Sequence, residues 1–341
     1  MKAVRIHEHG GPEVLRWEDV ADPSCGNNEV LVGIKAAAMN HLDIWVRSGL
    51  PGVPFPVIMG SDGSGVITEV GENVNEWKIS DEVIIQPGTY CGECDKCKAG
   101  QENYCSLYGI LGESEDGTQC ELIAVHSNNL ARKPSHLSFE EAAAFPLVFL
   151  TAHAMLIRRA NIQSGETVLI LGGASGVGSA AIQIAKLFDC IVIAVAGDER
   201  KLELCRELGA DHVLSYREES IYQRVKEITG GVGADIVFEH VGRATWTDSL
   251  RSLALGGRLV TCGATTGPKV EVDLRHLFRK QQSIMGSTMG DVSGFHEIVQ
   301  WLAEGKVRPV VDKVFPMNEI QDAHRYLEAS QQAGKIVLRP E

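Results

Sequence analysis

The 341-residue sequence is poor in basic residues: 32 lysines and arginines stand against 45 aspartates and glutamates, so its formal net charge is −13. Nucleic acids and anionic membranes both bind basic surfaces, and this deficit argues against either as a partner. No apolar run approaches the roughly 20 residues that a membrane-spanning helix needs. The N-terminus also lacks the apolar core of a signal peptide, which predicts a cytoplasmic location.

The sequence contains no internal repeat and no low-complexity segment. Hydrophobic residues make up 44% and charged residues 23%, a globular composition that excludes wholesale disorder. At about 150 residues per domain, the length predicts two domains with cores that need no disulfide bonds.

The first 150 residues contain short runs of high strand propensity that are separated by glycine, proline and asparagine. Examples are residues 29–35, 65–70 and 81–85. This pattern predicts a compact all-β unit.

From about residue 150, expected strands alternate with expected helices. Residues 167–171 are apolar without alternation, which is typical of a parallel strand that is buried on both faces. Further strands are expected at 191–196, 212–214, 235–239 and 258–262, and helices at 176–188, 199–208, 218–229 and 245–254. The alternation predicts a doubly wound α/β sheet. Periodicity alone does not assign the tail after residue 290 to either part.

A glycine-rich turn, Gly172-Gly173-Ala174-Ser175-Gly176-Val177-Gly178, follows the first of these strands. We expect Gly173 to permit the tight turn, Ser175 to let a phosphate approach the backbone, and Gly178 to let the helix pack closely. A dinucleotide pyrophosphate would then lie at the helix N-terminus, near Gly176 and Val177. The alternative is a turn without a ligand; the surrounding βα units favour the dinucleotide.

The second strand of this unit distinguishes between dinucleotides. Enzymes that bind NAD usually carry an acidic residue at its end, which binds the ribose 2′-hydroxyl. Here Ala196 stands at that position, and the cations Arg200 and Lys201 follow. These residues favour a 2′-phosphate and therefore NADP(H), whereas the nearby Asp198 keeps NAD(H) as the alternative. In a purely structural interpretation, Asp198 is a helix cap and the two cations form a solvated first turn.

Four of the nine cysteines are clustered, as Cys91-x2-Cys94-x2-Cys97-x7-Cys105. Four thiolates on one loop can close a tetrahedral zinc site that has no open position, and such a site is structural. An iron–sulfur cluster is the alternative. The other five cysteines are expected to be small buried residues.

The sequence resembles the medium-chain dehydrogenase/reductase superfamily over essentially its whole length. The resemblance is carried by the four-cysteine lobe and by residues 1–4, 10–15, 59–66, 139–146 and 334–338. It implies an α/β protein in which a GroES-like, β-rich catalytic domain is split around a Rossmann domain with a doubly wound parallel sheet, with a cofactor in the cleft between them. The implied bounds are 1–151 and 290–341 for the catalytic domain, about 88–107 for its structural-zinc lobe, and 152–289 for the Rossmann domain.

The zinc alcohol dehydrogenases of this superfamily hold a catalytic zinc through two cysteines and a histidine, with a glutamate beside the histidine. By resemblance, those positions fall on Asn40, on Ser61 followed by Asp62, and near Leu147, and a hydroxyl residue of their proton relay falls on Leu42. Amide, hydroxyl and aliphatic side chains cannot replace two thiolates and an imidazole around zinc. The comparison implies one structural Zn²⁺ and no catalytic zinc.

A closer resemblance is to the quinone-oxidoreductase-like branch, which works without catalytic zinc. Asn40 and Asp43 match its Asn-x-x-Asp motif and are the candidate catalytic residues. Asn40 would donate its amide to the substrate carbonyl or the cofactor, and Asp43 would orient Asn40 or neighbouring backbone. The resemblance implies further cofactor-binding residues: Gly197, Lys201 and Tyr216 at the 2′-phosphate, Thr151, Gly263 and Thr288 at the nicotinamide, His41 near the phosphates and Lys335 at the pyrophosphate.

Together these features predict an NADPH-dependent oxidoreductase that transfers hydride to an activated alkene or a quinone. Without a Lewis-acidic metal, hydrogen-bond donors or ordered water must stabilise the oxyanion, which suits a conjugated carbonyl substrate. Two alternatives stay open: an alcohol or aldehyde dehydrogenase with unusual catalytic-site ligands, and a non-catalytic protein that binds NADPH. The expected partner is a small-molecule substrate, and the resemblance implies homodimers or homotetramers joined through the Rossmann sheet.

Overall fold

The computed structural model describes residues 1–340. The chain folds into two compact units, one formed by Met1–Leu147 with Asp291–Glu341 and the other by Val148–Gly290. We call the first of these unit 1, in which the C-terminal segment joins the N-terminal one, and the second, inserted segment unit 2. The sequence predicts the changes of domain after residues 151 and 289.

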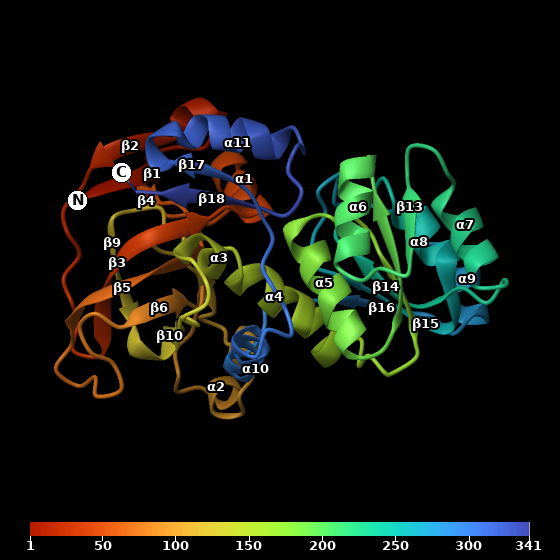
Figure 1. The fold of residues 1–341 in the computed structure, drawn as a ribbon, viewed down its shortest axis with the longest axis horizontal. Coiled ribbons are helices and arrows are strands. Elements are labelled where there is room, and N and C mark those ends of the chain that lie inside the picture. The colour runs from red at the N-terminus through yellow and green to blue at the C-terminus, as the bar shows by residue number, and fades with distance from the viewer. Residues whose placement is uncertain (341) are drawn as a thin grey trace. The chain divides into compact units, whose positions relative to one another are not determined.

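Unit 1 is built mainly of antiparallel strands. The larger set is β3 (Glu29–Ala38), β5 (Asp62–Val70), β6 (Glu82–Ile85), β9 (Leu122–His126), β10 (Leu130–Arg132), β17 (Val311–Pro316) and β18 (Lys335–Arg339). They form a sheet with the order β10-β6-β5-β3-β18-β17, in which β9 also pairs with β3 (Figure 1). Five shorter strands are β1 (Lys2–Ile6), β2 (Arg16–Asp19), β4 (Val57–Ile58), β7 (Gly88–Thr89) and β8 (Gly109–Ile110). These give a small sheet with the order β2-β1-β4 and a ribbon of β7 with β8.

The prediction of an all-β unit in the first 150 residues was wrong, because this segment also contains helices. They are α1 (His41–Ser48), α2 (Asp95–Lys98), α3 (Phe139–Ala143) and the start of α4 (Pro146–His153), and the C-terminal segment adds α10 (Val292–Ala303) and α11 (Ile320–Glu328). Helix α1 begins where Asn40 is extended and the Asp43 carboxylate accepts the Asn40 backbone N–H at 2.7 Å. A capping interaction of this kind favours a helix over continuation of the preceding strand.

A buried arginine joins the N-terminal and C-terminal parts of unit 1. The Arg47 guanidinium donates to the Gly10 carbonyl at 2.8 Å and to the Glu328 carboxylate of α11. Beside it, burial and the charge of Arg47 lower the pKa of His324 to about 3, so that this fully buried imidazole is neutral. Arg47 therefore links α1 to α11, and the neighbouring His324 adds no second positive charge beside it.

Unit 2 is a parallel sheet of six strands, which confirms the predicted doubly wound α/β class. The strands are β11 (Thr167–Ile170), β12 (Ile191–Ala196), β13 (His212–Ser215), β14 (Ala234–Glu239), β15 (Leu253–Thr261) and β16 (Ser283–Gly286), in the order β13-β12-β11-β14-β15-β16 (Figure 1). The helices are α5 (Gly176–Leu187), α6 (Glu199–Glu207), α7 (Ile221–Ile228), α8 (Trp246–Ser252) and α9 (Leu274–Arg279), preceded by a π-helix at Ala154–Arg159.

The strand order of unit 2 reverses between β11 and β14. The chain runs outward from β11 to β13 and then returns to β14 on the other side. In open α/β sheets, ligands bind at such a reversal, outside the carboxyl ends of the strands. This edge of the sheet is therefore where a dinucleotide is expected.

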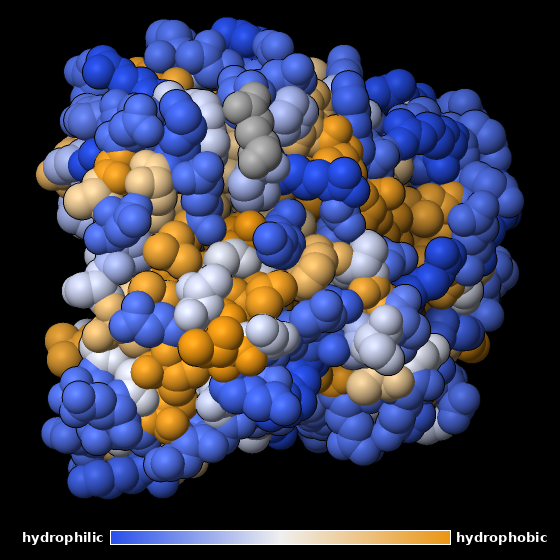
Figure 2. Space-filling view, turned by 60° about the vertical axis from the view of Figure 1, so that its left-hand side comes forward, coloured by the Kyte–Doolittle hydropathy of each residue, from blue (hydrophilic) through white to orange (hydrophobic). Residues whose placement is uncertain are grey.

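The face of the molecule in Figure 2 is hydrophilic over much of its area, and hydrophobic residues gather in patches within it. Among the described residues, none of the helices has the length and apolar character required to cross a membrane.

Candidate functional site

The glycine-rich turn connects β11 to α5 in the way that a dinucleotide turn requires. Ser175 is the N-cap of α5, and its hydroxyl accepts the Gly178 backbone N–H at 3.0 Å. Gly176 and Val177 form the first helical positions, where backbone N–H groups have no acceptor within the helix. A helix N-terminus of this kind binds phosphate groups through these donors and through the helix dipole.

The role of Gly173 in the turn differs from the one expected, whereas the role of Gly178 agrees with it. The left-handed backbone of the tight turn lies at Gly172, with φ of +59°, rather than at Gly173. A Cβ on Gly173 would instead lie 2.9 Å from the Cys205 sulfur, so this position lets α6 pack on the sheet. A Cβ on Gly178 would lie 2.2 Å from the Gly172 carbonyl oxygen, so close packing of helix on turn does require glycine there.

The ends of β12 and β13 bring the residues predicted for the 2′-phosphate together. A Cβ on Gly197 would lie 2.5 Å from the Tyr216 hydroxyl, so the tyrosine lies directly over this glycine. Asp198 is the N-cap of α6, where it accepts the Lys201 backbone N–H at 3.1 Å, and Arg200 and Lys201 follow in the first turn. The structural interpretation of Asp198 is therefore confirmed. Arg200 and Lys201 supply two cations and Tyr216 supplies a hydroxyl, and this set of donors fits a phosphate.

Two residues at the end of β14 were not predicted. The fully buried Glu239 carboxylate orders the loop that follows it, since it accepts from the backbone N–H groups of Val241 and Gly242 and from the hydroxyls of Thr245 and Ser249. His240 donates from Nε2 to the Leu171 carbonyl at 2.8 Å and lies 3.4 Å from the Ser175 hydroxyl. Loss of contact with water lowers the pKa of His240, which keeps the ring neutral. The sequence signal that could have drawn attention to them is Glu239 itself, a lone acidic residue at the end of an apolar strand.

The three residues predicted at the nicotinamide lie on three different elements or loops of unit 2. Gly263 follows β15 and Thr288 follows β16, so both come after the carboxyl ends of adjacent parallel strands. Thr151 is buried within α4. Their contact with a cofactor stays a prediction.

In unit 1, residues distant in sequence meet at the end of β3. The register pairs Ala38 of β3 with Asp62 on one side and with Val337 of β18 on the other. Asn40 follows β3 directly, so Asp62 and Lys335 flank it. The Lys335 ammonium donates to the Asn40 side-chain oxygen and, at 2.9 Å, to Asp62 Oδ2.

This unit 1 cluster, formed by Asn40, Asp43, Asp62 and Lys335, is buried and closely bonded. The exposed fraction of each side chain is 6% or less. Asn40 Nδ2 donates to Asp62 Oδ2 at 2.9 Å, and the Leu147 backbone N–H donates to Asp62 Oδ1 at 2.8 Å. Asn40, Asp43 and Lys335 were predicted site residues, whereas Asp62 was not. Its position beside a zinc-ligand position in the resemblance was the signal that could have found it.

Asp43 carries the most perturbed carboxyl group of the cluster. Burial raises the pKa of Asp43 to about 7, and the nearby Asp62 acts in the same direction. The backbone N–H groups of Asn40 and Gly60 and the charge of Lys335 act against this rise. The expectation that Asp43 orients Asn40 agrees with the hydrogen bond between its carboxylate and the Asn40 backbone.

Two polar neighbours of the cluster have other contacts. His41 is the first residue of α1, and its ring lies edge-on to Trp45, with centroids 5.2 Å apart. The buried Ser61 hydroxyl donates to the Leu111 carbonyl at 2.8 Å. The phosphate contact expected of His41 stays a prediction.

The four clustered cysteines converge on one point. Their sulfur atoms all lie within 4.8 Å of one another, with 3.8 Å between Cys91 and Cys97 and 3.5 Å both between Cys94 and Cys97 and between Cys91 and Cys105. Tetrahedral zinc with Zn–S bonds of about 2.3 Å requires sulfur atoms roughly 3.8 Å apart. The residues therefore fit one zinc ion. This spacing is too short for four ligands around a cluster of several irons.

The local backbone favours the thiolate of one cysteine in this group. The backbone N–H groups of Glu93 and Cys94 lower the pKa of the Cys91 thiol to about 6, which favours its thiolate. Throughout residues 1–340, these cysteines form the one group of three or more His, Cys, Asp or Glu side chains close enough to share a metal.

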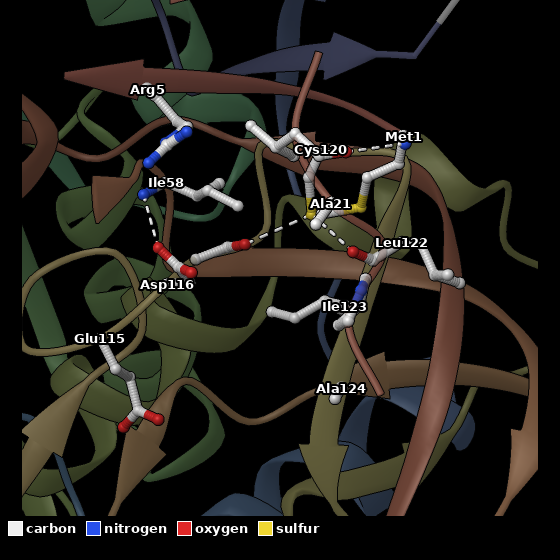
Figure 3. A pocket seen from close by; sticks show the side chains of 13 residues that line it. Met1, Arg5, Ala21, Ile58, Glu115, Asp116, Cys120, Leu122, Ile123 and Ala124 are labelled. Atoms are coloured by element: carbon white, nitrogen blue, oxygen red, sulfur yellow. Dashed lines mark hydrogen bonds between the residues drawn. The ribbon is translucent and has the colours of Figure 1, made fainter. Parts of the chain in front are cut away.

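A surface hollow of about 430 Å³ in unit 1 lies apart from these groups (Figure 3). Arg5 and Asp116 line it, and its wall includes Cys120, whose sulfur lies 3.4 Å from the Gly117 carbonyl oxygen and 3.3 Å from that of Leu122. Burial raises the pKa of the Cys120 thiol to about 12, so the thiol is no nucleophile at neutral pH. None of the predicted site residues lines this hollow.

Two family models match the chain: a zinc-binding dehydrogenase model over residues 176–304 and an alcohol dehydrogenase GroES-like domain over residues 26–135. A crotonyl-CoA carboxylase/reductase of Cereibacter sphaeroides is 31% identical across 96% of this chain and 84% of its own. A NAD-dependent alcohol dehydrogenase of Sulfolobus acidocaldarius is 33% identical across 99% of both chains. The crystal structure of a NAD-dependent alcohol dehydrogenase superposes with a TM-score of 0.96 at 45% identity, covering 99% of each chain.

A GroES-like unit together with a parallel sheet that carries a dinucleotide turn defines an α/β, nicotinamide-dependent oxidoreductase. The chain belongs to the medium-chain dehydrogenase/reductase superfamily. The predicted superfamily, fold class and enzyme class are thus confirmed.

Proposed function

We propose that this protein is an NADPH-dependent reductase of activated alkenes, namely enones, enals or enoyl thioesters, with quinones as related acceptors. The observation that carries this proposal is the unit 1 cluster. At the positions where the resemblance places catalytic zinc ligands, the chain has an amide held by Lys335 and Asp62. Such a cluster offers an N–H donor to a substrate oxygen rather than an electron pair to a metal.

A hydrogen-bond donor suits a conjugated substrate. The reduced nicotinamide, when bound, supplies a hydride. Addition to an isolated carbonyl concentrates charge on one oxygen, which zinc stabilises well. Addition at the far carbon of a conjugated system spreads the charge into an enolate, for which preorganised N–H donors are adequate. The chain's own contribution is to bind the substrate oxygen, to hold it in orientation and to exclude water from the buried amide.

NADP(H) is the proposed cofactor because of the groups gathered around Gly197. Arg200, Lys201 and the Tyr216 hydroxyl follow the ends of β12 and β13, and Asp198 already caps α6. Two cations near a small residue favour the 2′-phosphate. NAD(H) is the alternative, because Asp198 is near and the relative from Sulfolobus acidocaldarius is named as NAD-dependent.

Alcohol or aldehyde dehydrogenase activity is the second candidate function. The observation in its favour is that two of the relatives named above, including the solved structure at 45% identity, are called alcohol dehydrogenases. The crotonyl-CoA carboxylase/reductase, whose name points to an enoyl thioester, supports the first candidate instead.

A substrate screen separates the two candidates. NADPH oxidation is followed with but-3-en-2-one, crotonyl-CoA, 1,4-benzoquinone and butanal, and NADP⁺ and NAD⁺ reduction with ethanol and butan-1-ol. We expect turnover with the conjugated compounds. Activity confined to butanal and the alcohols would overturn the assignment in favour of the second candidate.

Cofactor choice is tested with Lys201→Ala. Loss of the ammonium should raise the Michaelis constant for NADPH by about tenfold or more and leave that for NADH within about twofold, since only NADPH carries the 2′-phosphate. The control is Lys226→Ala, an exposed lysine of α7. Equal changes for both cofactors would count against the 2′-phosphate site.

A further inference from the structure

Lys335, Asp62 and Asn40 form a closed ring of hydrogen bonds. The lysine Nζ donates to Asn40 Oδ1 and to Asp62 Oδ2, and Asn40 Nδ2 donates to the same aspartate oxygen. All three side chains are buried, with 4%, 0% and 6% exposed for Lys335, Asp62 and Asn40 respectively. The ring joins the zinc-ligand position at residue 40 to a cation from the opposite end of the chain.

The chemistry of the ring leaves one orientation for the amide of Asn40. An ammonium group only donates hydrogen bonds, and an ionised carboxylate only accepts them. Asn40 must therefore turn its oxygen to Lys335 and its NH₂ group to Asp62. Asp62 takes one of the two amide protons, and within residues 1–340 the other has no hydrogen-bond partner. Asp43 holds the backbone of Asn40 from the other side.

The same contacts make that remaining N–H a stronger donor. A cation on the oxygen of an amide withdraws electron density from its nitrogen, and hydrogen bonds in series polarise one another. A buried charge acts strongly because little water screens it. Lys335 thus places a positive charge behind Asn40, the residue at which the resemblance places a ligand of the catalytic zinc.

From this geometry we infer that Lys335 is a positioning residue that orients and polarises Asn40, so that its free amide N–H binds the oxygen of a conjugated carbonyl substrate. This inference rests on the proposed function. With reduced nicotinamide bound, the β-carbon of the alkene would receive a hydride, and the alkene electron pair would move toward the carbonyl oxygen, which the Asn40 N–H would hold as an enolate. A proton from water then adds at the α-carbon. Reduced nicotinamide, when bound, would supply the two electrons that reduce the alkene, and the added proton would come from water rather than from Lys335.

The resemblance implies a different role for Lys335, a direct contact with the cofactor pyrophosphate, and the two roles are separable. The experiment compares Lys335→Met and Lys335→Arg, using the NADPH dissociation constant from fluorescence titration and the kcat with but-3-en-2-one. We expect the Met variant to lose roughly 10²-fold to 10³-fold in kcat, as for removal of an oxyanion donor, with the NADPH dissociation constant within about twofold of wild type. The Arg variant, which keeps the cation, should recover at least part of kcat.

Lys133→Met is the matched control. Lys133 is also a lysine of unit 1 with 4% of its side chain exposed, and it pairs with Glu82 and the Leu137 carbonyl. An equal loss of kcat in this control would show that removal of any buried lysine damages the unit, and would overturn the inference. A raised NADPH dissociation constant with an unchanged kcat would overturn it in favour of pyrophosphate binding.

Two further measurements keep the test decisive. If the Met variant does not fold, the double variant Lys335→Met/Asp62→Asn removes both charges and leaves none buried alone. This double variant should still bind NADPH and have a low kcat. A wild-type kcat would overturn the inference.

The NMR signal of the Asn40 side-chain amide reports orientation without turnover and should move in Lys335→Met but not in Lys133→Met. A wild-type enzyme that reduces no alkene would refute the proposed function, whereas an unmoved amide signal would refute the role of Lys335.

Discussion

At the scale of single residues, the unit 1 cluster contains two buried carboxyl groups and one cation. Lys335 bonds directly to Asp62, whereas Asp43 accepts from backbone N–H groups instead. Ionisation of both aspartates would leave one negative charge without a buried counter-charge, which is costly in a region of low polarity. Burial is the main cause of the raised pKa of Asp43, at about 7, and the negative charge of Asp62 adds to it.

This imbalance predicts how stability depends on pH. The pKa of Asp43 rises from 3.8 to about 7 on folding, so between these values the folded chain holds a proton that the unfolded chain has lost. Unfolding free energy contributed by Asp43 is therefore greatest below about pH 4, falls as pH rises through this window, and is constant above about pH 7. Asp43→Asn, which is neutral at every pH, should lose this fall when urea unfolding is measured between pH 5 and pH 8.

The control for this prediction is Glu8→Gln, which alters an exposed carboxylate in the same unit. It should unfold with the pH dependence of the wild type. An Asp43→Asn variant whose stability falls between pH 5 and pH 8 as steeply as that of the wild type would contradict the assignment.

At the scale of elements, the four-cysteine loop has little regular structure to support it. Between Cys91 and Cys105 the chain forms one four-residue helix, α2, and one short 3-10 helix, Glu102–Tyr104. Neither buries an apolar face large enough to define the loop. From the convergence of its sulfur atoms we predict that a bound metal holds the loop together.

Metal analysis tests this implication directly. The wild type should contain about one zinc per chain, and Cys97→Ser should contain much less, with faster proteolytic cleavage between residues 91 and 105. NADPH binding, which we assign to unit 2, should change by less than about twofold. Cys25→Ser, a half-buried cysteine outside the group, is the control. Two zinc ions per chain in the wild type would revive a second, catalytic metal site.

The elements that the sequence predicted well are those whose pattern is local. Continuous apolar runs, the glycine-rich turn and the expected cap at Asp198 located β11, α5, β12 and α6 closely. Helix α1 was missed because Ile44, Trp45 and Val46 have strand propensity, and only the contact between Asp43 and Asn40 reveals the cap. Asp62 could not be placed beside Lys335 from spacing, because the pairing of β5 and β18 with β3 brings them together. Long-range register of this kind is invisible in one sequence.

At the scale of the whole molecule, the parallel sheet of unit 2 ends in an exposed edge. Among residues 1–340, strand β16 has a neighbour only on the side of β15, and its Ile284 is 37% exposed. Nearby in sequence, Leu274 and Phe278 of α9 are each 66% exposed. An unpaired strand with apolar residues around it is a template for another chain, and soluble proteins usually cover such an edge. A second copy, related by twofold symmetry, would extend the sheet with an antiparallel pair of β16 strands.

We therefore predict a homodimer that forms through β16 and α9, which is one of the two assemblies, homodimer or homotetramer, that the resemblance implies. Light scattering after size exclusion should give twice the chain mass of 37.0 kDa for the wild type. Charges at the interface would be buried without partners, so Leu274→Glu/Phe278→Glu should give the monomer mass. Val232→Glu changes a residue that is 68% exposed elsewhere in unit 2 and should leave the dimer intact. The glycine-rich turn lies at the β11–β14 reversal rather than at the β16 edge, so the monomeric variant should still bind NADPH. A wild type that elutes as a monomer, or a double variant that stays dimeric, would show that this edge is not the interface.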